Sequence, residues 1–156
     1  NVLSMPIATF NAIYPVGDTR RSSMFNVSGN SATLIVSDAS KVDLLRVKEI
    51  DLLLAEAAWR SDRLEEAKER LINASGGATE DYSTLTEETF GNALLQERQR
   101  QLVGTGQRMF DLIRFDEVST YIPVFTEADV ANGAAYWPLS AASIKGNGWS
   151  QNNYWK

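Results

Sequence analysis

The stretch 94–115 constrains the fold more than any other part of the chain, because ordered charges lie there beside apolar residues. The sequence predicts a helix over 86–103, and Gly104 follows at the position where a left-handed residue ends a helix. Gly106 then opens the next turn, and a second, short helix comes after it. We therefore expect two helices joined by a glycine turn.

The charges of the second helix recur every three residues. Arg108, Asp111 and Arg114 therefore share one face of it, with apolar residues on both sides. Charges this close to a core have to be paired, since removing one partner of a buried pair costs roughly 3–5 kcal/mol. We expect Glu97 or another acid to reach these arginines. The alternative is a solvated face with surface ion pairs worth about 0–1 kcal/mol each.

A helix is also predicted over 42–60, where a capping-box spacing over 40–43 announces it and apolar residues cover most of its circumference. Such a helix is expected to be buried. Its charged stripe then needs a partner, for which the face of Arg108 is the obvious candidate. The alternative is a solvent-facing stripe with an i,i+4 pair between Glu56 and Arg60. The stripe consists of Arg46, Glu49, Leu53, Glu56 and Arg60.

A further helix follows, for which Asp62 and Glu65 have capping-box spacing and Gly76-Gly77 marks the end. The two helices form a hairpin that resembles one tetratricopeptide-type repeat of about 34 residues. Because about three repeats are usually needed for stability, either the tail folds back or the chain is the C-terminal part of a larger helical array. The buried side of the second helix is expected to consist of Leu64, Ala67, Leu71 and Ile72.

The remaining parts of the chain lack helical periodicity. Residues 1–40 are rich in Ser, Asn, Gly and Thr, and they predict a loop followed by a hairpin whose strands join through the four-residue connection 28–31. Residues 116–156 predict an irregular tail that is rich in aromatic residues. Together with helices over 42–115, these patterns predict a single, mainly α domain with a small N-terminal β-hairpin.

The composition of the 156-residue chain narrows its function. A formal net charge of −5 and a pI near 4.8 argue against nucleic acid and anionic membranes, both of which attract basic surfaces. The chain contains no cysteine and no histidine, which removes thiolate sites, the commonest general base and the usual zinc ligand. We expect no metal or other cofactor. An enzyme is the least supported class, because no glycosidase-type carboxylate pair or calcium-loop pattern stands out.

Carbohydrate recognition, by contrast, needs only flat aromatic faces and a few polar groups that fix orientation. The alternative for each aromatic residue is that it anchors its segment to the core. An exposed pair of coplanar rings would favour a sugar ligand, whereas a continuous apolar groove between helices would favour a peptide. The expected ligand-binding residues are Phe10, Asn11, Tyr14, Arg20, Arg21 and Phe25 in one cluster and Asn147 with Trp149 in a second.

Several segments resemble the SusD/RagB family of Bacteroidetes. Residues 46–57 are similar to its R-x-x-E-x-x-L-x-x-A-E-A helix, 137–152 to its closing L-P-I-P-x-x-E-I and Q-N-P-G-Y segments, and 18–20 to a D-x-R segment. The signature ER-x-x-E-L-x-x-E-G-x-R-x-F-D-L-x-R is also present, except that Gln101 and Thr105 stand where the family often has Glu. The matching residues are Glu97, Arg98, Leu102, Gly106, Arg108, Phe110, Asp111, Leu112 and Arg114.

The resemblance implies a tetratricopeptide-like fold and a cell-surface protein of the outer membrane, held there by a lipid anchor outside this chain. It also implies that the protein captures a glycan or other nutrient and passes it to a SusC-like TonB-dependent transporter without covalent chemistry. The alternative from another class is a helical-repeat module that binds a peptide or a partner subunit. A scaffold network of charges would lock the helices together through Arg46, Glu49, Glu56, Glu97, Arg98, Arg108, Asp111 and Arg114.

Overall fold

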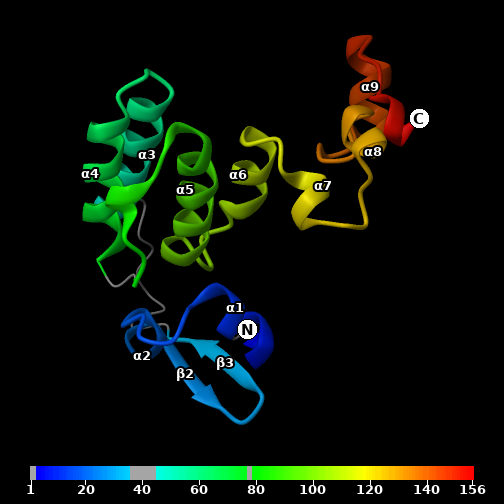
Figure 1. Ribbon diagram of the computed structural model, residues 1–156. Coiled ribbons are helices and arrows are strands. Elements are labelled where there is room, and N and C mark those ends of the chain that lie inside the picture. Colours follow the sequence, from blue (N-terminus) through cyan, green and yellow to red (C-terminus); the bar gives the residue numbers. More distant parts are fainter. Residues whose placement is uncertain (1–2, 36–44, 77–78) are drawn as a thin grey trace. The chain divides into compact units, whose positions relative to one another are not determined.

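Helices dominate the structure (Figure 1). Along the described residues, 3–35, 45–76 and 79–156, the computed structural model contains nine α-helices, two short 3-10 helices and one three-stranded antiparallel sheet. This architecture confirms the predicted mainly helical class with a small N-terminal β structure. The chain forms two compact units, Asn1–Arg108 and Met109–Lys156, within the region that the sequence predicted as one domain.

Three helices that pack on one another form the helical core of the first unit: α3 (Val47–Trp59), α4 (Leu64–Ser75) and α5 (Glu87–Gln101). Small residues on α3 and α4 let the two helices approach closely, and larger apolar residues of α5 cover them. Burying each large side chain stabilises the fold by roughly 1.5–3 kcal/mol. The buried apolar residues are Leu52, Ala55 and Ala58 on α3, Ala67, Leu71 and Ala74 on α4, and Phe90, Leu94 and Leu95 on α5.

Helix α3 begins later than predicted and is not buried on every side. Leu45 and Arg46 are not helical, and the predicted capping box over 40–43 lies outside the described residues. Val47, Ile50 and Leu54 follow one another at i, i+3 and i+7 and are exposed. The prediction of full burial is therefore wrong for this face, because apolar periodicity shows how many sides could be buried but not which neighbours cover them.

The start and the end of α4 test the capping signals that the sequence predicted for this helix. The predicted capping box of Asp62 is wrong, because Asp62 has a φ of 58° outside the helix and Arg63 occupies the N-cap without a side-chain bond. Ile72 is exposed, and Ala74 is buried instead. Gly76, with a φ of 46°, ends α4 as predicted.

The glycine turn between the next two helices is also confirmed. Helix α5 ends at Gln101 and α6 (Arg108–Arg114) follows, while Gly104 and Gly106 have φ values of 79° and 82°. A Cβ atom on Gly104 would lie 2.9 Å from Leu34 Cδ2, so both the backbone angle and the space favour glycine there.

The N-terminal sheet has the strand order β1-β3-β2, built from β1 (Ser4–Pro6), β2 (Phe25–Ser28) and β3 (Ser31–Leu34). The predicted hairpin forms, but Ser28 pairs with Ser31, so the connection is Gly29-Asn30 and not four residues long. Strand β1 and the short helices α1 (Ile7–Ile13) and α2 (Arg20–Ser23) lie in what the sequence predicted as loop. Their brevity explains the miss, because seven or fewer residues give barely two helical turns of pattern.

The second unit contains more regular structure than the irregular tail that the sequence predicted over 116–156. It contains α7 (Val118–Tyr121), α8 (Glu127–Ala131), α9 (Ala141–Asn147) and the 3-10 helix η2 (Asn153–Trp155). The other 3-10 helix, η1 (Tyr82–Thr84), lies in the first unit. Within the described parts of the chain, no helix combines the length and apolar character that crossing a membrane requires.

Candidate functional site

The first predicted ligand cluster forms a core. Phe10, Tyr14 and Phe25 are buried, and their ring centroids lie 5.0–5.4 Å apart around Ala32. None of the three rings offers an open face to a sugar in this structure, so the alternative that they anchor their segments holds. The reason is that the three rings form the buried centre of this sheet, against which partly buried apolar residues such as Met5, Ile7 and Leu34 pack.

The polar members of that cluster divide into a buried and a peripheral part. Arg20 is only 4% exposed and acts as a structural residue. Arg21 lies 4.5 Å above the Phe10 ring, and its guanidinium donates to the Tyr14 carbonyl and, at 2.7 Å, to Asn11 Oδ1. Arg21 and Asn11 are thus the members that border solvent. A ligand role for these two stays a prediction.

Buried charges gather around Glu97, which has no exposed side-chain surface. Arg20 bridges Glu97 and Asp18, with Arg20 Nε 2.9 Å from Asp18 Oδ1. The Tyr82 hydroxyl donates to Glu97 Oε2 at 2.9 Å, and Arg100 Nη1 lies 3.5 Å from the same oxygen. This cluster ties the N-terminal segment to α5, as a buried carboxylate with several charged and hydrogen-bonding partners can do.

The electrostatics of the Glu97 cluster match its burial. Burial alone would raise the pKa of Asp18, but hydrogen bonds from the side chain and backbone of Arg20 lower the pKa below its usual value. Burial is also the main cause that raises the pKa of the Tyr14 and Tyr82 hydroxyls above their usual range. Both tyrosines therefore stay neutral donors, and Tyr14 donates to the Arg100 carbonyl at 2.9 Å.

Gln101 shows why an amide can replace a carboxylate at this point of the family signature. Its Nε2 atom lies 2.9 Å from the Ala74 carbonyl, 3.0 Å from the Ser75 carbonyl and 3.1 Å from Glu97 Oε1. A carboxylate could not donate to the two carbonyls at the end of α4. The amide of Gln101 therefore links the end of α4 to α5 and the Glu97 cluster.

The other predicted scaffold residues have diverse surroundings. Arg108 donates to the Leu95 carbonyl at 3.0 Å, and Arg114 lies 2.9 Å from Asp111 Oδ1. Glu56 is buried and pairs with Arg60 at 3.0 Å, the i,i+4 pair that the sequence offered as an alternative. Pairing of the α3 stripe with the α6 face stays a prediction. The remaining scaffold members are Arg98, which is buried, Glu49, which is half-buried, and Arg46, which is exposed.

The second predicted ligand cluster is open to solvent but is not part of a cavity among those described. Trp149 is 55% exposed. Asn147 donates to the Ser143 carbonyl at 3.0 Å and so belongs to the last turn of α9. The structure therefore gives this pair no enclosing walls.

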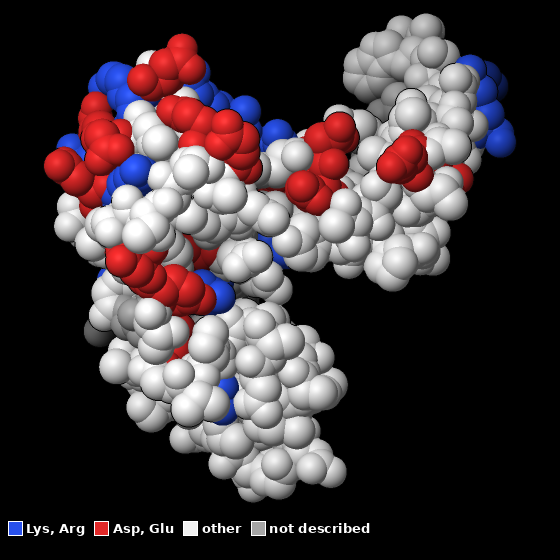
Figure 2. Space-filling view, viewed as in Figure 1, with Lys and Arg blue, Asp and Glu red and all other residues white. Residues whose placement is uncertain are grey.

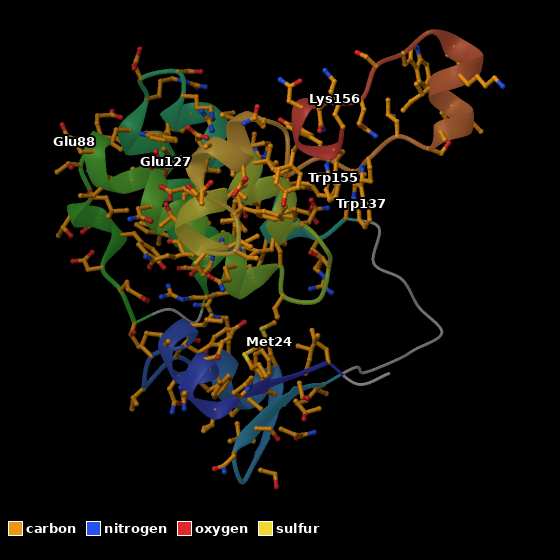
Figure 3. The ribbon with its side chains drawn as sticks, turned by 90° about the vertical axis from the view of Figure 1, so that its right-hand side faces the viewer. Met24, Glu88, Glu127, Trp137, Trp155 and Lys156 are labelled. Atoms are coloured by element: carbon orange, nitrogen blue, oxygen red, sulfur yellow. The ribbon has the colours of Figure 1, made fainter. Side chains whose placement is uncertain are left out.

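An aromatic pocket that sequence reasoning did not select lies in the second unit. The pocket has a volume of about 350 Å³. Trp137 is 92% exposed, and the exposed Trp155 lies beside it (Figure 3). Tyr136, which is also exposed, lines the same pocket. We call it the Trp137 pocket; it is lined by Met109, Phe125, Ala134, Ala135, Tyr136, Trp137, Pro138 and Trp155.

Hydrogen bonds to the chain end hold the walls of the Trp137 pocket. Asn152 Nδ2 donates to the Gly133 carbonyl at 3.0 Å, and Trp155 Nε1 donates to the Tyr136 carbonyl at 2.8 Å. Gln151 both donates to and accepts from the backbone of Leu139. These bonds bring segments about twenty residues apart together and fix the indole of Trp155 against Tyr136.

The sequence carries one local signal for this pocket. Tyr136 and Trp137 are adjacent aromatic residues that precede Pro138, and the residue before a proline favours extended backbone. Neighbouring side chains of an extended segment point to opposite sides, so both rings cannot enter one core. The sequence pattern therefore favours one of the two rings at the surface.

A larger and more polar cleft of about 560 Å³ shares Ala135 and Tyr136 with the Trp137 pocket. We call it the acidic cleft, because its lining includes three carboxylates. Asp116 has a φ of 59°, a conformation that Asp and Asn adopt more readily than most residues. The lining residues are Ile113, Asp116, Glu117, Val118, Ser119, Thr120, Glu127, Val130, Ala131, Ala135 and Tyr136.

Open aromatic rings beside hydrogen-bonding groups are typical of small-molecule binding sites. Among the residues that the structure describes, no group of three or more acidic side chains could hold a metal ion. A model of the SusD family matches residues 23–155, and the chain therefore belongs to the SusD family. Members of this family are non-catalytic binding proteins, and membership implies a glycan-binding role at the cell surface. No curated protein and no solved structure matches the chain.

Proposed function

We propose that this protein binds a glycan nutrient at the outer-membrane surface and passes it to a SusC-like TonB-dependent transporter. Membership of the SusD family supports the general role. The observation that carries the site is Trp137, whose indole is 92% exposed at a pocket shared with Tyr136 and Trp155. Tyr136, Trp137 and Trp155 are exposed together around one pocket, and contiguous exposed apolar surface of this kind marks binding sites.

The Trp137 pocket suits the apolar face of a sugar ring. Its volume of about 350 Å³ lies near the lower end of the range for small-molecule sites, which is about 300–1,000 Å³. Trp and Tyr lose few rotatable bonds on binding, so stacking costs little conformational entropy. The binding is reversible and leaves the ligand chemically unchanged, which transfer to a transporter requires. Family membership also supports attachment to the membrane through a lipid anchor.

The test is isothermal titration calorimetry of Trp137→Ala against a panel of soluble polysaccharides and oligosaccharides. The wild type should bind at least one glycan saturably. The variant should bind it about five- to thirty-fold more weakly, because an aromatic contact of roughly 1–2 kcal/mol is lost. Trp149→Ala is the matched control, since Trp149 is exposed but does not line the pocket, and it should retain wild-type affinity.

Two results would contradict this assignment. If Trp149→Ala abolishes binding while Trp137→Ala does not, the site lies at the cluster of Asn147 and Trp149. If the folded wild type binds no glycan in the panel, the glycan role itself is refuted.

The exposed face of α3 supports a second candidate, a module that binds a partner helix. Val47, Ile50 and Leu54 have the i, i+3, i+7 spacing with which a helix meets another helix. In that case an amphipathic helical peptide should bind the protein, and Trp137→Ala should leave its affinity unchanged.

A further inference from the structure

The Trp137 pocket and the acidic cleft have a common wall. Ala135 and Tyr136 line both, so a ligand that stacks on the rings of the pocket lies next to the cleft. In Figure 3, Glu127 lies apart from Trp137 and Trp155, although all three belong to the second unit. A ligand longer than one sugar ring can therefore contact both cavities.

The charge around the two cavities has one sign. Asp116, Glu117 and Glu127 line the acidic cleft, and no lysine or arginine lines either cavity within 109–156, a part of the chain that the structure describes in full. Acidic side chains are prominent on the visible face of this unit in Figure 2. The basic residues of the unit are Arg114, which lies beside Asp111, and Lys145 and Lys156.

We infer that the site selects its glycan by charge: it favours oligosaccharides that carry amino groups and disfavours those that carry carboxylate or sulfate groups. The inference rests on the proposed function and names the class of glycan. Stacking on Trp137 is indifferent to charge, because the apolar face of a sugar is the same in both kinds. An ammonium group in the cleft gains attraction from three carboxylates, whereas an acidic group is repelled by them and meets no lysine or arginine among the lining residues.

The expected size of the preference for amino sugars follows from the solvent exposure of the three carboxylates. Asp116 and Glu127 are exposed and Glu117 is half-buried, so solvent screens each interaction. Each carboxylate should change affinity by at most about five-fold, and the three together by about ten-fold or more. The preference should shrink as salt is raised, because the Debye length falls from about 10 Å at 0.1 M to about 3 Å at 1 M.

The test uses matched ligands in which one substituent is either charged or neutral. One pair is an oligosaccharide of glucosamine and the same oligosaccharide fully N-acetylated, measured near pH 6, below the usual pKa of an amine. The other is an oligogalacturonide and its methyl ester. Calorimetry should show tighter binding of the amine than of the acetamide, and weaker binding of the acid than of its ester.

Variants of the three lining carboxylates test whether the charge preference comes from the acidic cleft. The combined variant Asp116→Asn, Glu117→Gln and Glu127→Gln should lose most of both preferences. Asparagine suits the left-handed conformation at position 116, which limits damage to the fold. Glu69→Gln is the matched control, because Glu69 is an exposed carboxylate of α4 that lines neither cavity, and it should keep both preferences.

The outcomes separate the inference from the proposed function. Equal binding within both pairs, or an unchanged preference in the combined variant, would refute charge selection while glycan binding stands. If Trp137→Ala weakens the charged and neutral forms alike, the pocket and the cleft have the separate roles assigned to them. If none of the four ligands and no other glycan binds, the proposed function and the inference both fall.

Discussion

Removing the guanidinium of Arg20 tests the Glu97 cluster most directly. Arg20 Nη2 lies 2.7 Å from Asp18 Oδ2, and Arg20 Nη1 pairs with Glu97 Oε1. The side chain of Arg20 is 5% exposed, and those of Asp18 and Glu97 have no exposed surface. Arg20→Ala therefore leaves two carboxylates in a buried site without the cation that lies between them.

The expected loss of unfolding free energy is roughly 3–5 kcal/mol, the usual cost of breaking a buried pair. Glu97 keeps Tyr82, Gln101 and Arg100 as partners, which moderates the loss. In the Arg20→Ala variant, Asp18 would retain the hydrogen bond from the backbone amide of residue 20 but lose those from the guanidinium. The comparison is an exposed pair, Arg63 with Glu66, whose side chains are 55% and 41% exposed. Its loss should cost about 0–1 kcal/mol.

Urea unfolding followed by far-UV circular dichroism measures the effect in the first unit, because the three longest helices, of 13, 12 and 15 residues, lie there. Arg20→Ala should lower the midpoint strongly and Arg63→Ala only slightly. In combination with Glu97→Ala, Arg20→Ala should cost less than the sum of the single losses, since the two residues interact. A loss below 1 kcal/mol for Arg20→Ala, or one equal to that of Arg63→Ala, would refute the buried cluster.

Three other predictions follow from the structure. Gly91→Ala should destabilise the fold by about 1–3 kcal/mol in the same assay, because the new Cβ would lie 2.6 Å from the rigid ring of Trp59. Alanine favours helix by about 1 kcal/mol over glycine, so a net gain in stability would show that the contact with Trp59 costs little. Gly133→Ala should weaken glycan binding in calorimetry, because Gly133 has a φ of 94° and a Cβ there would lie 2.7 Å from Asn152. Asn152 donates a hydrogen bond to the Gly133 carbonyl and so holds the pocket. Unchanged affinity would refute the role of this hydrogen bond. The lowered pKa of Asp18 contributes stability that is present above its unfolded pKa near 3.9 and is lost as pH falls through the folded pKa. Asp18→Asn should therefore be less stable than wild type near pH 6 and lose less stability between about pH 5 and pH 3 in urea titrations, and parallel profiles would exclude this contribution.

Local patterns in the sequence predicted the longer helices and the glycine turns after α4 and α5. The glycines at 76, 104 and 106 were identified as terminators because an L-residue pays a steric cost at positive φ, wherever the helix lies in the fold. The family signature predicted membership, because it combines residue types at fixed spacings over a long stretch. The sequence did not predict the short helices α1 and α7, because so few residues show no helical periodicity.

Long-range packing decided the site. Nothing local indicates that Arg20 meets Glu97, 77 residues away, or that Phe10 enters a core while Trp137 stays exposed. The Trp137 pocket likewise exists only because Asn152 and Trp155 bond to residues 19 positions earlier in the chain. The amino-acid sequence by itself determined the longer helices of residues 47–114 and the family to which the chain belongs, because periodicity, glycine sterics and motif spacing act over neighbouring residues. The tertiary structure alone decided which charges are buried together and which aromatic rings face solvent, because that depends on which distant segments cover each surface.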